Sequence, residues 1–236
     1  MFAIFSDPVK MAQQMEIILD AYGFAIWETL YALALEVIFA YAIGLPLGVV
    51  LVIGEDKGIR PMHPLLMKAL NVIINLLRSI PFLILMIIAL PLSKIIVGTK
   101  VGTAATIPPM VVAAFPLIAR MVESSLREVN QGVIEAAQSM CASAWQIVTK
   151  VLLPEALPSL ISGATITVGT ILGYGAMAGV LGGGGLGQLA INYGYYNTKY
   201  LVMWAAVIGL IILVQIFQSA GGRLATKCDK RLRNKN

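Results

Sequence analysis

The chain has 236 residues, of which 58% are hydrophobic and 12% are charged, and its formal net charge is +5. Soluble domains carry about 25% charged residues, so this composition excludes an ordinary soluble protein. The mean hydropathy of +0.85 indicates a membrane protein instead. The basic excess then needs no nucleic acid as a partner, because Lys and Arg mark the cytoplasmic side of a membrane protein.

Long apolar runs predict membrane-spanning helices. A bilayer core about 30 Å thick needs roughly 20 apolar residues per helical span. The sequence has five such runs and lacks the alternation of apolar and polar residues that is typical of a β-barrel. We therefore expect an all-α membrane protein with one domain over residues 1–236. The five predicted spans are 21–53, 70–92, 101–119, 157–181 and 201–222.

The first two predicted spans contain charged residues, which are rare in lipid and often functional. Glu28 lies near the outer end of the first span, where we expect it to be wetted, whereas Glu36 lies deeper. In the second span Asn71, Asn75 and Arg78 share one helical face. This polar stripe forms structural hydrogen bonds or lines a water-filled path for a substrate, and the sequence leaves both explanations open.

The fourth predicted span is rich in small and hydroxyl-bearing residues. Gly169 and Gly173 form a pair that allows another helix to approach closely. A second stripe of this span consists of Gly163, Thr167, Thr170, Tyr174 and Met177. Either this stripe packs against another helix, or it lines a path in which its hydroxyls and thioether tolerate an amphipathic solute. Together with the stripe of the second span, the candidate translocation path consists of Asn75, Arg78, Thr167, Thr170, Tyr174 and Met177.

The distribution of Lys and Arg predicts the orientation of the chain. If the C-terminus is cytoplasmic, twelve of these residues lie on the cytoplasmic side and four on the other side. With five spans, the N-terminus then lies outside. The twelve are Lys57, Arg60, Lys68, Arg120, Arg127, Lys150, Arg223, Lys227, Lys230, Arg231, Arg233 and Lys235.

The sequence offers no catalytic or metal-binding set. It contains one histidine, His63, two separated cysteines and no phosphate-binding motif of the type G-x-x-x-x-G-K-[ST]. We therefore predict no catalytic residue and no metal site, and we expect the chain not to be an enzyme. Cys141 and Cys228 both lie on the predicted cytoplasmic side, where thiols stay reduced, so no disulfide is expected.

A mildly polar segment, EAAQSMCASAWQIVTKVLLP, lies between the third and fourth spans at residues 135–154. Ser143 and Gln146 fit a capping box, which predicts a helix that begins near Ala144. Residues 129–140 have the pattern of another short helix. The segment is therefore predicted to form a helix, a turn and a second helix on the cytoplasmic side of the membrane.

The spacing in this segment resembles the EAA loop of permease subunits in ATP-binding-cassette importers, although the family usually has glycine where Cys141 stands. Four further segments, WETL at 27–30, RSIPF at 78–82, KVLLPEALP at 150–158 and GGLGQLAINYGY at 184–195, are similar to the methionine-uptake branch. The residues that match the loop are Glu135, Ala136, Ala137, Cys141, Leu153 and Pro154.

The resemblance implies a type I permease-like transmembrane domain in a bacterial inner membrane. In that family the permease pairs with a second copy of itself, and the EAA loop of each copy supplies a coupling helix that docks on one of two ATPase subunits. These ATPases bind ATP and Mg, so no cofactor is expected on this chain. An extracytoplasmic binding protein, often lipid-anchored, delivers the substrate. Carried onto this chain, Glu135 is the expected charged contact to the ATPase.

Several alternatives remain open from the sequence. Methionine is the substrate that the resemblance implies, and another small amino acid or a thioether compound is the alternative. A secondary transporter would need internal repeats, and a membrane-embedded enzyme would need convergent polar groups; the sequence has neither. At Cys141, a left-handed turn would cost about 1–2 kcal/mol compared with glycine, unless the turn is built with right-handed dihedrals.

Overall fold

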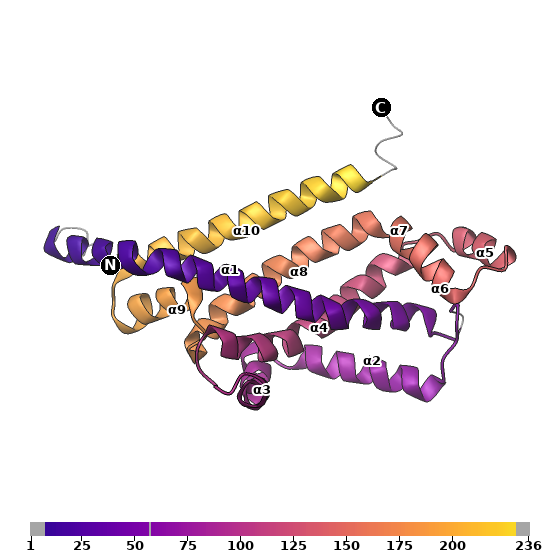
Figure 1. Ribbon diagram of the computed structural model, residues 1–236, viewed down its shortest axis with the longest axis horizontal. Helices are drawn as coiled ribbons and strands as arrows, with labels where there is room; N and C mark the ends of the chain where they lie inside the picture. The colour runs from indigo at the N-terminus through magenta and orange to yellow at the C-terminus, as the bar shows by residue number, and fades with distance from the viewer. Residues whose placement is uncertain (1–7, 57, 230–236) are drawn as a thin grey trace. The chain divides into compact units, whose positions relative to one another are not determined.

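The computed structural model describes residues 8–56 and 58–229, and within these ranges all regular structure is helical. Figure 1 shows the helices in chain order. Two stretches, Val148–Leu152 and Ala190–Tyr196, are wide π-helical turns, and Gly179–Leu181 is a 3-10 turn. The α-helices are α1 (Pro8–Ile53), α2 (Pro64–Ser79), α3 (Phe82–Ile96), α4 (Thr103–Arg127), α5 (Gln131–Ser139), α6 (Ala144–Ile147), α7 (Leu153–Glu155), α8 (Leu157–Ala178), α9 (Gly185–Leu189) and α10 (Tyr200–Cys228).

Among the described residues, four helices are long and apolar enough to cross a membrane, and the bent pair of α2 and α3 makes five if it counts as one span. The four are α1, α4, α8 with the 3-10 turn that follows it, and α10. The predicted all-helical membrane class is thus confirmed with four to five candidate spans. Of the basic residues that predict the orientation, Lys57, Lys230, Arg231, Arg233 and Lys235 lie outside the described residues.

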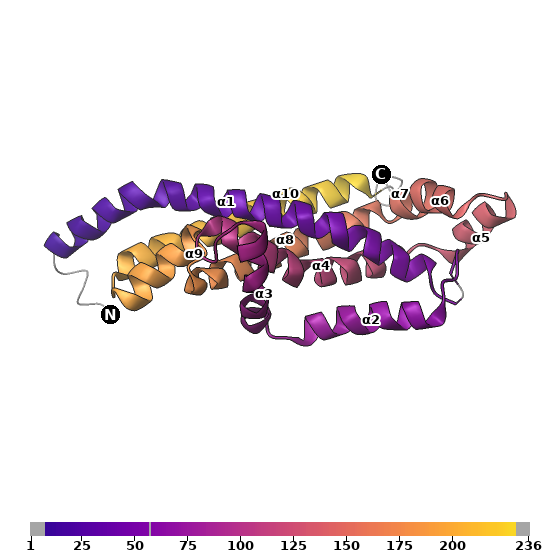
Figure 2. The same cartoon turned by 60° about the horizontal axis from the view of Figure 1, so that its bottom comes forward.

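The second predicted span, 70–92, is not one continuous helix. Ile80 has φ −78° and ψ 129°, and Pro81 has φ −54° and ψ 134°, so both residues leave the helical region. Figure 2 shows this link between α2 and α3. The cause is local, because proline lacks the N–H that a helix needs and disfavours helical dihedrals at the residue before it.

The chain folds as two compact units, and the four long helices contribute residues to both. Unit 1 contains Met1–Ile38, Pro81–Val112 and Val168–Ile216, and unit 2 contains Phe39–Ile80, Ala113–Thr167 and Phe217–Asn236.

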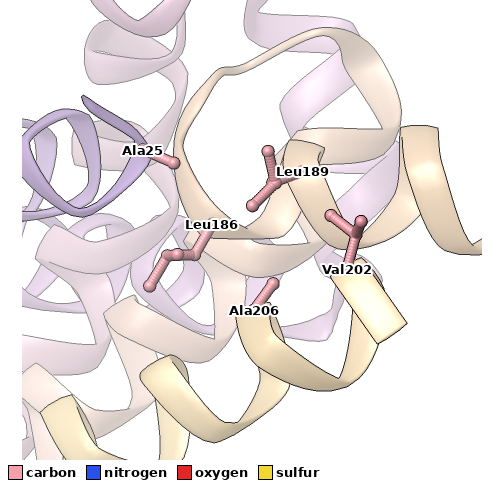
Figure 3. Packing of buried hydrophobic residues seen from close by; sticks show 5 residues of the cluster. All are labelled: Ala25, Leu186, Leu189, Val202 and Ala206. Atoms are coloured by element: carbon pink, nitrogen blue, oxygen red, sulfur yellow. The ribbon is translucent and has the colours of Figure 1, made fainter. Parts of the chain in front are cut away.

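The core of unit 1 packs α9 against α1 and α10. Its buried residues are Ala25 from α1, Leu186 and Leu189 from α9, and Val202 and Ala206 from α10 (Figure 3). The two alanines leave room for the leucines between the helix backbones, so apolar packing helps to hold the short helix α9. This packing positions the glycine-rich segment that precedes it.

The core of unit 2 packs the inner part of α1 against α2 and α4, with Leu51, Met67, Ile74 and Ala119 buried together. A Cβ added at Gly44 would lie 2.7 Å from Ile118 Cβ, and one at Gly48 would lie 2.6 Å from Val122 Cβ. These two glycines therefore let α1 and α4 approach closely, as small residues do in membrane proteins. By contrast, no heavy atom of the described residues lies within 4 Å of a Cβ built at Gly173, where the sequence suggested close packing.

Candidate functional site

The predicted coupling loop, which we define as residues 129–154, forms two short helices joined by a tight turn (Figure 1). Helix α5 begins after Asn130, whose side chain accepts a hydrogen bond from Gly132 N at 2.8 Å. At its other end, Ala142 N donates to Ala137 O at 3.2 Å and Cys141 N donates to Gln138 O at 2.9 Å. These two bonds form a Schellman motif, in which the residue after the helix takes a left-handed conformation.

Cys141 is the left-handed residue of this motif, with φ 57°. Of the two alternatives that the sequence left open, the structure therefore has the left-handed turn with a cysteine in it. A side chain with a Cβ is strained in this region by about 1–2 kcal/mol. The turn has the geometry that suits glycine, and its hydrogen bonds hold the cysteine there.

We expect Cys141→Gly to stabilise the protein. The substitution relieves the left-handed strain, and about 0.4–1 kcal/mol of that gain is offset by the greater freedom of glycine in the unfolded chain. The net gain of up to about 1 kcal/mol corresponds to a thermal midpoint roughly 2–4 °C higher in a detergent unfolding assay. Cys141→Ala keeps a Cβ and should leave the midpoint unchanged; a lower midpoint for Cys141→Gly would contradict this account.

The second helix of the coupling loop begins as predicted. Ser143 N donates to Gln146 Oε1 at 2.8 Å, and Gln146 N donates to Ser143 Oγ at 3.3 Å. This is a complete capping box, and α6 starts at Ala144. The chain then continues through the π-helical turn into α7 and α8.

The structure places the predicted loop residues in different environments. Glu135 and Ala136 are exposed, whereas Ala137 is buried, so the EAA triplet has an inner and an outer side. Cys141 and Pro154 are exposed and Leu153 is half-buried. Two large apolar side chains that the sequence reasoning did not select, Met140 and Trp145, are 77% and 75% exposed. The sequence pattern that could have indicated them is a large apolar residue on each side of the turn in an otherwise polar segment.

A cavity of about 300 Å³ in unit 2 lies between α5 and the C-terminal ends of α1 and α4, and Glu135 is among its lining residues. Arg127, which also lines it, donates from Nη1 to Glu55 Oε2 at 3.1 Å and from Nη2 to Glu123 Oε1 at 2.8 Å. A second contact joins Arg127 Nη2 to Glu55 Oε1. Single exposed ion pairs contribute little to stability, but here Arg127 is shared by two carboxylates. It joins Glu55, which follows α1, to the end of α4, four residues before α5 begins at Gln131.

A second polar site in unit 2 is an open depression of about 530 Å³ that side chains of α2 and α4 line. Arg120 Nη2 donates to Asn71 Oδ1 at 2.8 Å and to Asn75 Oδ1 at 3.0 Å, and Arg120 Nη1 donates to Glu123 Oε2 at 2.6 Å. We call this site the polar basin. Its lining residues are Asn71, Asn75, Arg78, Arg120, Glu123, Ser124 and Arg127.

The polar stripe that the sequence predicts forms only the α2 half of the polar basin. The predicted third span ends at Ala119 and leaves Arg120 and Arg127 as loop charges, whereas α4 continues to Arg127. The signal that could have found the other half is the spacing of Arg120, Glu123, Ser124 and Arg127, which places these residues on one face of a helix.

The remaining candidate path residues are distributed over both units. Thr167, in unit 2, is buried and donates to Gly163 O at 2.9 Å, so its hydroxyl is used within its own helix. Thr170, Tyr174 and Met177 belong to unit 1. The Tyr174 ring stacks on Phe82 with centroids 4.1 Å apart, and Met177 is 50% exposed.

Two motifs that are distant in the sequence meet in unit 1. Glu28 accepts hydrogen bonds from Thr103 Oγ1 at 2.5 Å and from Gly185 N at 2.9 Å, and Thr29 Oγ1 accepts one from Leu186 N at 2.9 Å. The WETL segment of α1 therefore holds the start of α9. Glu28 was expected to be wetted, but it is half-buried and both its oxygens accept protein hydrogen bonds.

The described residues contain no group of three or more His, Cys, Asp and Glu side chains that could hold a metal ion. Both cysteines, Cys141 and Cys228, are free thiols.

Known proteins match this chain along most of its length. Residues 44–230 match the family described as the binding-protein-dependent transport system inner membrane component. The probable D-methionine transport system permease protein MetI of Vibrio cholerae is 47% identical over 207 residues, which cover 88% of this chain and 92% of that protein. The methionine import system permease protein MetP of Bacillus subtilis is 45% identical over 168 residues, which cover 70% of this chain and 76% of that protein.

Solved structures agree with these relatives. A chain of the MetNI methionine ABC transporter in an inward-facing conformation has a TM-score of 0.88 at 43% identity, and the match covers 91% of this chain and 99% of that chain. A chain of an amino acid ABC transporter with histidines has a TM-score of 0.64 at 15% identity, which supports the fold alone.

These matches decide between the classes of protein that the sequence left open. A family match that spans well over half of the chain argues against a secondary transporter and against a membrane-embedded enzyme. The chain therefore belongs to the family of binding-protein-dependent transport system inner membrane components, and it is a multi-pass permease subunit of a bacterial ABC importer.

Proposed function

We propose that this permease carries methionine into the cell. The observation that supports this substrate most strongly is the similarity to two proteins named as methionine permeases, at 47% and 45% identity. The similarity to the methionine transporter chain extends over 91% of this chain at 43% identity. At this level the arrangement of the path is expected to be kept together with the fold.

The partners follow from the same proposal. Two copies of the chain form the path, and each copy docks its coupling loop on an ATPase subunit that binds ATP and Mg. A binding protein on the outer face, lipid-anchored in our proposal, delivers methionine. The exposure of Glu135, Ala136 and Cys141 supports the docking role, because these side chains are available to a partner. Exposed Met140 and Trp145 add apolar surface of the kind that anchors protein interfaces.

The coupling loop transmits force only if its two helices are held firmly. The Schellman motif at Cys141 and the capping box at Ser143 fix the angle between α5 and α6. The Arg127 network joins Glu55, two residues after the end of α1, to the C-terminal end of α4, which leads into the loop. A movement of the ATPase against α5 would therefore displace the inner ends of two spanning helices together.

We propose that the C-terminus is cytoplasmic and the N-terminus is outside. A protease-cleavable tag fused to the C-terminus should then remain intact when protease is added to spheroplasts, whose outer membrane has been removed, because the inner membrane shields it. The same tag should be cleaved after the inner membrane is permeabilised. A tag fused to the N-terminus provides the matched control and should be cleaved in intact spheroplasts, and cleavage of the C-terminal tag from outside would contradict this orientation.

The substrate proposal is tested by uptake in cells. Labelled L- and D-methionine are supplied to a strain in which the chromosomal copy of this permease is deleted, with and without a plasmid that restores it. The plasmid should restore uptake, and unlabelled methionine should compete with it better than other small amino acids do. If the plasmid restores uptake of another amino acid but not of methionine, that amino acid is the substrate and the methionine proposal is wrong.

A further inference from the structure

The polar basin is built from two matched rows of side chains in unit 2. Helix α2 contributes Asn71, Asn75 and Arg78, which follow one another at i, i+4 and i+7. Helix α4 contributes a row with the spacing i, i+3, i+4 and i+7. All lining residues of the basin are polar or charged, in a chain that is 58% hydrophobic.

The surface of α2 indicates what the basin faces. Met67 and Ile74 are buried against α1 and α4. Another part of its surface consists of exposed apolar side chains, which suit lipid. The polar row cannot face hydrocarbon, because charged side chains in a span face water or protein. The exposed apolar residues are Leu65, Leu66, Val72, Ile73 and Leu76.

The charges of the basin are unevenly satisfied. Arg120 is held by Asn71, Asn75 and Glu123, and its Nε is buried without a hydrogen-bond partner. Arg127 is held by Glu123 and Glu55. Three arginines thus face two carboxylates, so one positive charge remains. Arg78 is exposed and has no hydrogen bond or ion pair among the described residues.

We propose that Arg78 binds the carboxylate of an amino acid that passes through the permease. This inference rests on the proposed function, since it assigns the substrate's carboxylate to a site on the path. A guanidinium binds a carboxylate with two parallel hydrogen bonds. Within the polar stripe of α2, Asn71 and Asn75 make structural hydrogen bonds to Arg120. Arg78 is then the residue of this stripe that is available to the substrate.

Arg78 also lies in the last turn of α2, where a cation interacts favourably with the helix dipole. The dipole alone accounts for a positive charge at this position. It does not account for the adjoining row of polar side chains on α4, or for the open depression of about 530 Å³ that the two rows line. A carboxylate site accounts for all three features.

The test is the binding of methionine to the purified full-length permease in nanodiscs, without its ATPase or binding protein. Labelled methionine is displaced by unlabelled methionine or by methioninol, which lacks the carboxylate. The wild-type protein should prefer methionine by roughly tenfold or more, since hydrogen bonds to charged groups are strong. Arg78→Gln should remove this preference, and Arg78→Lys should restore it in part.

Lys68→Gln removes one positive charge from an exposed position of the same helix outside the basin, and it should keep the full preference. A thermal midpoint equal to that of the wild type checks that Arg78→Gln folds. The proposal is overturned if the wild type shows no saturable binding or no preference, or if Arg78→Gln keeps the preference. Equal displacement by inorganic phosphate would also overturn it. The proposed function fails separately, if the complete wild-type transporter does not take up methionine.

Discussion

Glu135→Lys should leave the permease in the membrane and strongly weaken its coupling to ATP. Glu135 is an exposed carboxylate on α5, the helix that we expect to dock on the ATPase. A lysine there would place a positive charge against the basic group that the carboxylate is expected to meet. Because like charges across an interface cost several kcal/mol, and each 1.4 kcal/mol is a factor of ten, ATP-driven uptake should fall by roughly tenfold or more.

The measurement combines co-purification of the ATPase on a tagged permease with uptake in reconstituted vesicles. Glu16→Lys, which makes the same charge change at an exposed position of α1, is the matched control and should retain both activities. Normal uptake by the Glu135→Lys variant would remove this residue from the coupling contact. Loss of the protein from the membrane would point to a defect in folding, which the thermal midpoint of the purified variant measures independently.

Gly184→Ala should destabilise the protein strongly although it adds a single methyl group. Gly184 has φ 75°, and a Cβ there would lie 2.0 Å from Thr103 Oγ1 and 3.1 Å from Glu28 Oε2. With ψ −176° as well, these dihedrals fall in a region that is essentially restricted to glycine, and they cost a residue with a Cβ about 1–3 kcal/mol. The clash additionally displaces Thr103 from Glu28, which frees one of the two hydrogen bonds of that carboxylate.

In a chain of this size each kcal/mol lowers the thermal midpoint by about 2–4 °C, so we expect a fall of roughly 5 °C or more for Gly184→Ala. Gly173→Ala is the matched control, because its new Cβ meets no heavy atom within 4 Å and its helix favours alanine. The midpoint of the control should stay constant or rise slightly. An unchanged midpoint for Gly184→Ala would mean that the Glu28 contact does not stabilise this segment.

The coupling loop could be predicted almost completely from the sequence because its structure depends on neighbouring residues. The capping box at Ser143 and the turn at Cys141 involve bonds between residues at most five positions apart. Such local interactions leave a pattern that can be read directly. The conformation of Cys141 stayed open. The sequence shows that a left-handed cysteine would be strained, but it does not show the hydrogen bonds that hold the cysteine in that conformation.

The break in the second span was missed for a different reason. The apolar run from 70 to 92 is long enough for one span, but Pro81 restricts its own backbone dihedrals and those of Ile80. The predicted third span ends too early because charged residues are rare within spans. In the structure Arg120 and Glu123 continue the helix, since they satisfy each other and the asparagines of α2.

Contacts between distant segments could not be predicted. Glu28 meets Gly185 across 157 positions, and Arg120 meets Asn71 across 49 positions. No local pattern encodes such pairs, because they depend on how the helices pack. This is why the polar stripe on α2 was visible in the sequence and its partner row on α4 was not.

The most direct test of the proposed function is uptake by liposomes that contain the permease, its ATPase and its binding protein. With ATP inside or outside as the ATPase orientation requires, labelled methionine should accumulate against its gradient. Omission of ATP, of the permease or of the binding protein should abolish accumulation. Accumulation that persists without ATP, or that shows no preference for methionine over other amino acids, would contradict the assignment of this chain as the permease of a methionine importer.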